Sequence, residues 1–182
     1  MSTYPKISYT AVSMVQNLLT RSDAQGFNEI FAGVAAEYSG VTPIQVTSSN
    51  LILGRIDPAS VVQAGGPSFL SYPMFVLSPA KSDAIGNVAM KITPSTFSGV
   101  VGVSLDAFIK FPGGGIIPDG NALGCAFEDT IVSMLNEASA YSLYTGGLIY
   151  NNEVSVDFGK MEWATNCWTQ CVMSTIVFRL VA

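Results

Sequence analysis

The sequence predicts a single α+β domain in which N-terminal helices and a central helix over residues 121–138 pack on a mixed or antiparallel sheet. Three observations predict this fold: helical spacing of apolar residues before residue 40, the same spacing in the central segment, and alternating apolar residues in the second half. Because the chain has 182 residues, we expect one domain over residues 1–182 with one hydrophobic core.

Two helices are expected before residue 40. Residues 8–20 carry apolar side chains at helical spacing, which predicts the first helix. The second helix has a longer apolar stripe and is followed by Gly40, a typical helix stop. Its stripe consists of Phe27, Ile30, Phe31, Val34, Ala35 and Tyr38.

Residues 41–72 are expected to form an irregular excursion. Short β-like runs at residues 44–47 and 51–53 are interrupted by residues that break regular structure, namely Pro43, Pro58, Gly65, Gly66 and Pro67. We therefore predict little regular structure in this segment.

Strand patterns begin at residue 73. The apolar run 73–77 and the alternating run 88–92 predict two strands, joined by a hairpin loop over residues 78–86. The clearest strand is residues 101–111, where every odd position is apolar, so we expect the odd face to contact the core. A glycine-rich segment at 113–115 ends that strand.

The second half also predicts the central helix and two closing strands. The helical stripe consists of Leu123, Phe127, Ile131, Met134, Leu135 and Ala138. Cys125 lies beside this stripe, and we expect it to be a small buried hydrophobe. Residues 150–158 alternate as an amphipathic strand that ends at Gly159, and the run 171–181 is apolar on both faces, so both of its faces should be covered.

The composition favours contact with other protein chains. Charged residues make up 12% of the sequence, against about 25% in typical soluble domains. No apolar run is long enough for a transmembrane helix and no signal peptide is visible, so we expect a cytoplasmic product without a membrane partner. The net charge of −5 and the 8 scattered basic residues disfavour nucleic acid. The remaining use for uncharged surface is burial in an oligomer interface.

The sequence predicts neither catalysis nor a cofactor. There is no histidine, which excludes Ser-His-Asp and Cys-His catalysis. Cys167 and Cys171 match no zinc motif and would lie about 13 Å apart on one strand, too far for a disulfide. The Gly113–Gly115 loop lacks the lysine of a phosphate-binding loop, so a turn is favoured over a nucleotide site. We expect no metal, no cofactor and no enzyme activity.

Five residues are candidates for an oligomer interface. Phe108 lies between Asp106 and Lys110 on the even face of the predicted strand 101–111, where an aromatic bracketed by charges is typical of an interface anchor. An ordinary outer face, or a face covered by one of the protein's own helices, is the alternative. Trp163 and Trp168 flank a polar stretch between the last two strands, where they would anchor an interface, stack on a sugar or pack in the core.

This order of elements resembles phage tail terminators and the related neck, or tail-completion, proteins. The resemblance is carried by the strand 102–110, the helix through 131–135 and the closing segments 150–158 and 174–180, with Trp168 between them. It implies an α+β subunit that forms a ring, with a hexamer expected, at the head-proximal end of the tail. Residues 41–72 depart from the family's compact layout, so other ring-forming tail or neck components fit equally.

The function expected from this resemblance is that of a virion structural protein. Family members stop tube growth and present a docking face, so tail-tube, sheath or neck proteins are the expected partners and the virion tail or neck is the expected location. A tail-tube or baseplate subunit is the nearest alternative. A different class is a small carbohydrate-binding or hydrolytic domain that uses Trp163, Trp168 and nearby Glu162 or Asp157.

Overall fold

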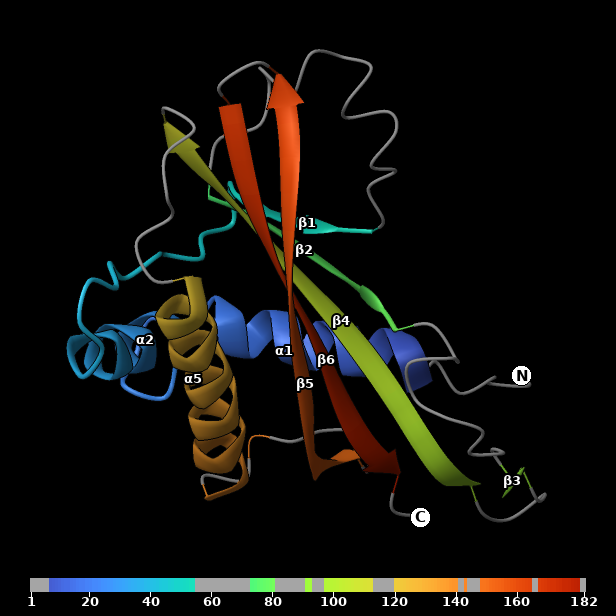
Figure 1. The fold of residues 1–182 in the computed structure, drawn as a ribbon. Helices are drawn as coiled ribbons and strands as arrows, with labels where there is room; N and C mark the ends of the chain where they lie inside the picture. The colour runs from blue at the N-terminus through green and yellow to red at the C-terminus, as the bar shows by residue number, and fades with distance from the viewer. Residues whose placement is uncertain are drawn as a thin grey trace.

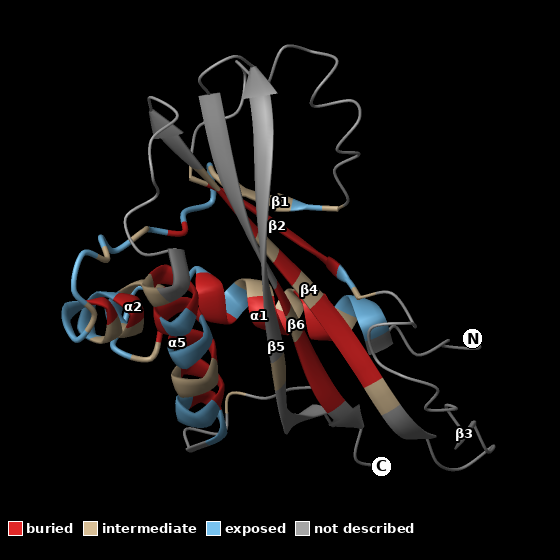
Figure 2. Cartoon of the chain, viewed as in Figure 1, coloured by how far each residue is buried: buried red, intermediate tan, exposed pale blue. Residues whose placement is uncertain are grey.

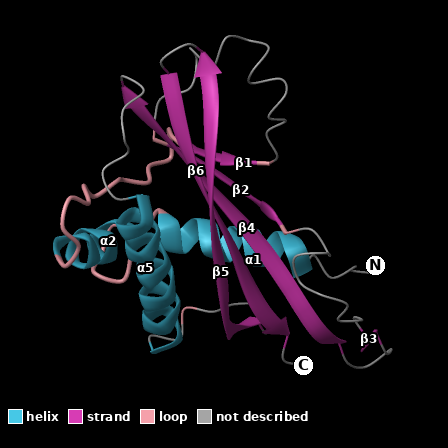
Figure 3. Ribbon diagram, viewed as in Figure 1, coloured by secondary structure: helices cyan, strands magenta, loops and turns pink. Residues whose placement is uncertain are grey.

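The computed structural model confirms an α+β fold in which helices pack on a mixed sheet (Figures 1 and 3). It describes residues 7–54, 73–80, 91–92, 97–112, 120–140, 143, 148–164 and 167–180. The elements in chain order are α1 (Ile7–Leu19), α2 (Phe27–Ala36), β1 (Leu51–Leu53), β2 (Met74–Pro79), β3 (Lys91–Ile92), β4 (Phe97–Pro112), α5 (Gly120–Ala140), β5 (Leu148–Ala164) and β6 (Cys167–Leu180).

The strands follow the order β1-β2-β4-β6-β5 across the sheet, and β3 pairs with the beginning of β4. β1 and β2 run parallel, whereas the pairs β2–β4, β4–β6 and β6–β5 are antiparallel. The last strand of the chain, β6, therefore lies between β4 and β5. The chain returns to the sheet from α5 as β5 and then inserts β6 against β4.

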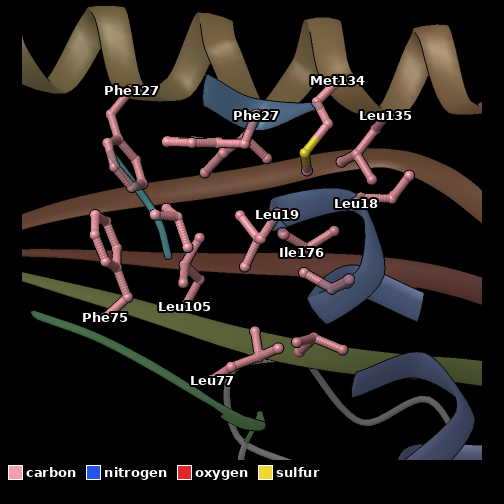
Figure 4. Close-up of a cluster of buried hydrophobic side chains, with 14 of the residues drawn as sticks. Leu18, Leu19, Phe27, Phe75, Leu77, Leu105, Phe127, Met134, Leu135 and Ile176 are labelled. Carbon is pink, nitrogen blue, oxygen red and sulfur yellow. The ribbon is translucent and has the colours of Figure 1, made fainter. Parts of the chain in front are cut away.

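The helices cover the face of the sheet that carries the odd positions of β4. Figure 1 shows α1 crossing the sheet, with α2 and α5 beside one another. The predicted stripe of α5 is buried along its whole length, which confirms the helical pattern. Odd positions of β4 from Val101 to Ala107 are buried in the same core as Ile176 and Phe178 of β6. Figure 4 shows Leu105 and Ile176 of this core between α5 and the strands.

The opposite face of the sheet is also covered. Met74, Val76, Phe108 and Val177 are buried, yet they lie outside the core that the helices form with the sheet. In Figure 2 the described middle parts of β2, β4 and β6 are mostly buried. β6 is thus buried on both faces, through Ile176 on one and Val177 on the other, as its continuous apolar pattern predicts.

The turn between α1 and α2 depends on one glycine. A Cβ atom at Gly26 would overlap the backbone carbonyl oxygen of Arg21, so only glycine allows the chain to pass this closely. α2 then ends at Ala36, earlier than its apolar stripe suggests, and Tyr38 lies in the turn that follows. Gly40 has φ of +80°, the left-handed conformation expected of the predicted helix stop.

Two other sequence expectations differ from the structure, and the described part of the irregular excursion agrees with it. Cys125 is exposed, because it lies two residues from both Leu123 and Phe127 and therefore about 200° around the helix from the buried stripe. β5 does not end at Gly159 but continues to Ala164, since Gly159 keeps its register with Cys171. β1 is the only regular strand within the described part of the irregular excursion, residues 41–54. The predicted hairpin loop and the first part of the run 88–92 lie outside the described residues.

No helix in the described part of the chain combines the length and apolar character needed to cross a bilayer.

Candidate functional site

The five candidate interface residues do not occupy one row of the sheet. Phe108 pairs with Met74 on one side and with Cys171 on the other. Trp168, by contrast, is the register partner of Phe111, which belongs to the odd positions of β4. Trp163 lies at the register shift between Glu162 and Ala164, next to the hairpin that joins β5 and β6. The backbone register therefore separates Trp168 from Asp106, Phe108 and Lys110.

The expectation that Phe108 is exposed is wrong. Only 8% of the residue is accessible to solvent. β4 is an inner strand with β2 and β6 on its two sides, and the neighbouring Met74 is also buried. Alternation showed that Phe108 lies on the even face, but it carries no information on whether that face is covered.

Asp106 is a half-buried carboxylate on the same even face. Burial raises the pKa of Asp106, and the hydrogen bond donated by the Ser104 hydroxyl at 3.0 Å opposes that rise. Its register partners are Val76 and Met173, both apolar. A half-buried carboxylate that is hydrogen-bonded to a hydroxyl of its own strand suits a structural role.

The carboxylates considered for a hydrolytic site lie apart. Asp157 and Glu162 are both in β5, and the register with β6 is unbroken from Glu153 to Glu162. Because successive strand residues alternate between the two faces, a separation of five positions places these two residues on opposite faces of the sheet. This placement does not suit the paired carboxylates of glycoside hydrolysis.

The edge strand β5 is a feature that sequence reasoning missed. Within the described residues β5 pairs with β6 along one side, and its other side is the end of the sheet. The strand is 17 residues long, with register shifts near both ends. A long edge presents a row of backbone donors and acceptors that another chain can pair with. The sequence predicted only residues 150–158 of this strand, and it did not reveal the order of the strands.

A second missed feature is an open depression between α2 and α5, which we call the α2–α5 groove. It measures about 520 Å³ and is lined by Val34, Glu37, Tyr38, Asp129, Val132 and Ser133. The phenol of Tyr38 donates a 2.5 Å hydrogen bond to the carboxylate of Asp129 and so joins the end of α2 to α5. That hydrogen bond, together with partial burial and the negative charge, raises the pKa of Tyr38 to about 12.

The groove lies in the most acidic part of the molecule. Residues 7–50 and 120–140, which we call the helical segments, contain six acidic residues, all exposed, and one basic residue, Arg21. The acidic residues are Asp23, Glu29, Glu37, Glu128, Asp129 and Glu137. Together with Arg21 they give the helical segments a charge of −5, which equals the net charge of the whole chain, so the rest of the chain has equal numbers of acidic and basic residues. The acidic residues are visible in the sequence, but only the structure shows that the two segments that carry them lie in one layer.

Arg21 does not neutralise the groove. Its guanidinium binds Asp23, with Nε donating to the carboxylate at 2.9 Å. Within the described residues, no group of three or more histidine, cysteine, aspartate or glutamate residues is arranged to hold a metal ion. The groove therefore presents carboxylate oxygens beside apolar side chains.

No family model matches the chain, and no curated protein matches its sequence.

Proposed function

We propose that this protein is a structural assembly subunit that forms a closed ring. In the expected setting the ring occupies the head-proximal end of a phage tail, where it stops tube growth and joins the tail to the neck. The observation that carries the assembly part of this proposal is the position of the long strand β5 at the end of the sheet. The phage setting is supported by the resemblance in the order of elements.

The β5 edge favours assembly for a physical reason. Its register with β6 is unbroken from Glu153 to Glu162, so the opposite side offers a regular row of donors and acceptors to a further strand. Monomeric proteins usually shorten or cover such an edge, because it invites pairing between chains. A strand added from a neighbouring copy would satisfy these groups.

A ring imposes one condition on this contact. Closed rings with more than two members use two different patches on each subunit. The strand that pairs with β5 must then come from another part of the neighbouring copy, not from its β5. The low proportion of charged residues, 12%, suits a subunit with two such patches.

The other functions have less support. A tail-tube or baseplate subunit would use the same edge, so it differs from the ring proposal in the partner rather than in the contact. A carbohydrate-binding or hydrolytic domain would use Trp163, Trp168 and nearby Glu162 or Asp157, and the register argues only against a hydrolase that pairs the two carboxylates.

Hydrogen exchange tests the edge contact directly. We expect the alternate amides of residues 153–162 that point away from β6 to be protected at high protein concentration and to lose protection on dilution. β6 is a matched control, because it has neighbours on both sides and its exchange should not depend on concentration. Exchange in β5 that stays constant while the mass of the assembly changes would reject β5 as the contact.

A further inference from the structure

The α2–α5 groove combines two kinds of surface. Val34 and Val132 contribute half-buried apolar side chains, whereas Glu37 and Asp129 are exposed carboxylates at the same depression. The hydrogen bond from Tyr38 fixes the orientation of the Asp129 carboxylate. An amphipathic cation matches such a surface, because its aliphatic stem packs on valine while its charged end remains near carboxylates.

The charges around the groove also favour a cationic partner. Glu128 precedes Asp129 within α5, and Glu29 and Glu137 add further exposed acidic residues to α2 and α5. The only basic residue of the helical segments, Arg21, is paired with Asp23. The field over this layer is therefore negative and attracts a positive partner.

We propose that the α2–α5 groove receives a lysine or arginine side chain from a second copy of this chain. This inference rests on the proposed function, since it requires that copies of the chain meet in a ring. The aliphatic stem packs between Val34 and Val132, and the cationic end pairs with Glu37 and Asp129.

The charge distribution also limits which parts of the two copies can meet. Seven of the 8 basic residues lie outside the helical segments, so the inserted cation comes from a part of the neighbour that is not its own groove. Two grooves placed face to face would bring carboxylates against carboxylates, which is unfavourable. The contact therefore joins two different parts of the chain, as each contact in a closed ring does.

Charge reversal at the groove tests this contact. Glu37→Lys should weaken self-association about tenfold, because it replaces an attraction by a repulsion. Glu37→Gln, which keeps the size of the side chain, should weaken it less. The control is Glu29→Lys, which makes the same change of charge at an exposed position of α2 outside the groove and should have a smaller effect. Sedimentation equilibrium gives the dissociation constants, and circular dichroism checks the fold.

The outcomes separate this inference from the proposed function. A wild-type protein that stays monomeric would overturn the ring, and the groove contact with it. If the wild type assembles, and both Glu37 variants assemble as tightly as Glu29→Lys, the ring stands and the groove contact is overturned. The groove would then be free for a different basic partner.

Discussion

The ring of Phe27 in α2 lies 5.4 Å from the ring of Phe127 in α5, centroid to centroid, at an interplanar angle of 60°. Phe31 joins the pair, with its ring 5.9 Å from that of Phe127. All three residues are fully buried. This aromatic cluster holds the two helices together beneath the α2–α5 groove, so its integrity is a condition for the groove.

Truncation of this cluster should be costly. We expect Phe127→Ala to lower the free energy of unfolding by about 3–5 kcal/mol, because it leaves a cavity in the core. A double-mutant cycle with Phe27→Leu and Phe127→Leu should give a coupling of about 0.5–1.5 kcal/mol beyond the separate losses. Urea unfolding measures each value, and strictly additive losses would show that the two rings do not interact.

The buried hydroxyl of Ser174 predicts a stabilising substitution. Ser174 is fully buried, and its Oγ has no hydrogen-bond partner among the residues that the structure describes. Because an unsatisfied buried hydroxyl is destabilising, Ser174→Ala should raise the free energy of unfolding by about 1 kcal/mol. Thr130→Val is the contrasting variant, since the equally buried Thr130 hydroxyl donates a 2.6 Å hydrogen bond to the carbonyl of Ala126. A loss of stability in Ser174→Ala would refute this account of the site.

The Tyr38–Asp129 hydrogen bond predicts an unusual titration. The pKa of Tyr38 is raised from 10.0 to about 12, so this phenol should be among the last of the 7 tyrosines to ionise. Because the folded pKa is raised, the stabilising effect is complete below about pH 10 and is lost as the pH rises through about 12. Asp129→Asn should return the pKa towards its ordinary value.

Tyrosinate absorbance, measured as the difference between wild type and Tyr38→Phe, isolates this titration. Glu128→Gln is the matched control, because Glu128 raises the pKa of Tyr38 only weakly and through its charge. An equal effect of Glu128→Gln and Asp129→Asn would mean that charge in general, not the hydrogen bond, sets the pKa.

The exposure of Cys125 predicts its reactivity. We expect Cys125 to react with a thiol reagent in the folded protein, and Cys125→Ser to remove that reaction while changing the free energy of unfolding by no more than about 0.5 kcal/mol. A Cys125→Ser variant that loses several times this amount would indicate a buried thiol, as the sequence alone suggested.

Periodicity in the sequence predicted the helices and strands and their core faces well, but it predicted less well whether the opposite faces are covered. The stripe from Leu123 to Ala138 identified both α5 and its buried face, because helical spacing determines which residues point together. Alternation likewise placed Val103 and Leu105 on the core face of β4. Phe108 was misjudged, because coverage of the even face depends on segments remote in sequence.

The two candidate interaction surfaces depend on tertiary arrangement. The β5 edge follows from β6 inserting between β4 and β5, and no local pattern encodes the order of strands. The α2–α5 groove brings Tyr38 to Asp129, residues whose proximity depends on how α2 packs on α5. The sequence shows which chemical groups these residues carry, but it does not show that they lie close together.

The central claim is that the chain assembles into a closed ring, and native mass spectrometry over a range of concentrations tests it most directly. The account predicts one discrete species that stops growing as concentration rises, with six times the 19.2 kDa mass of one chain as the expected value. A protein that remains at the mass of a single chain at every concentration would contradict the account.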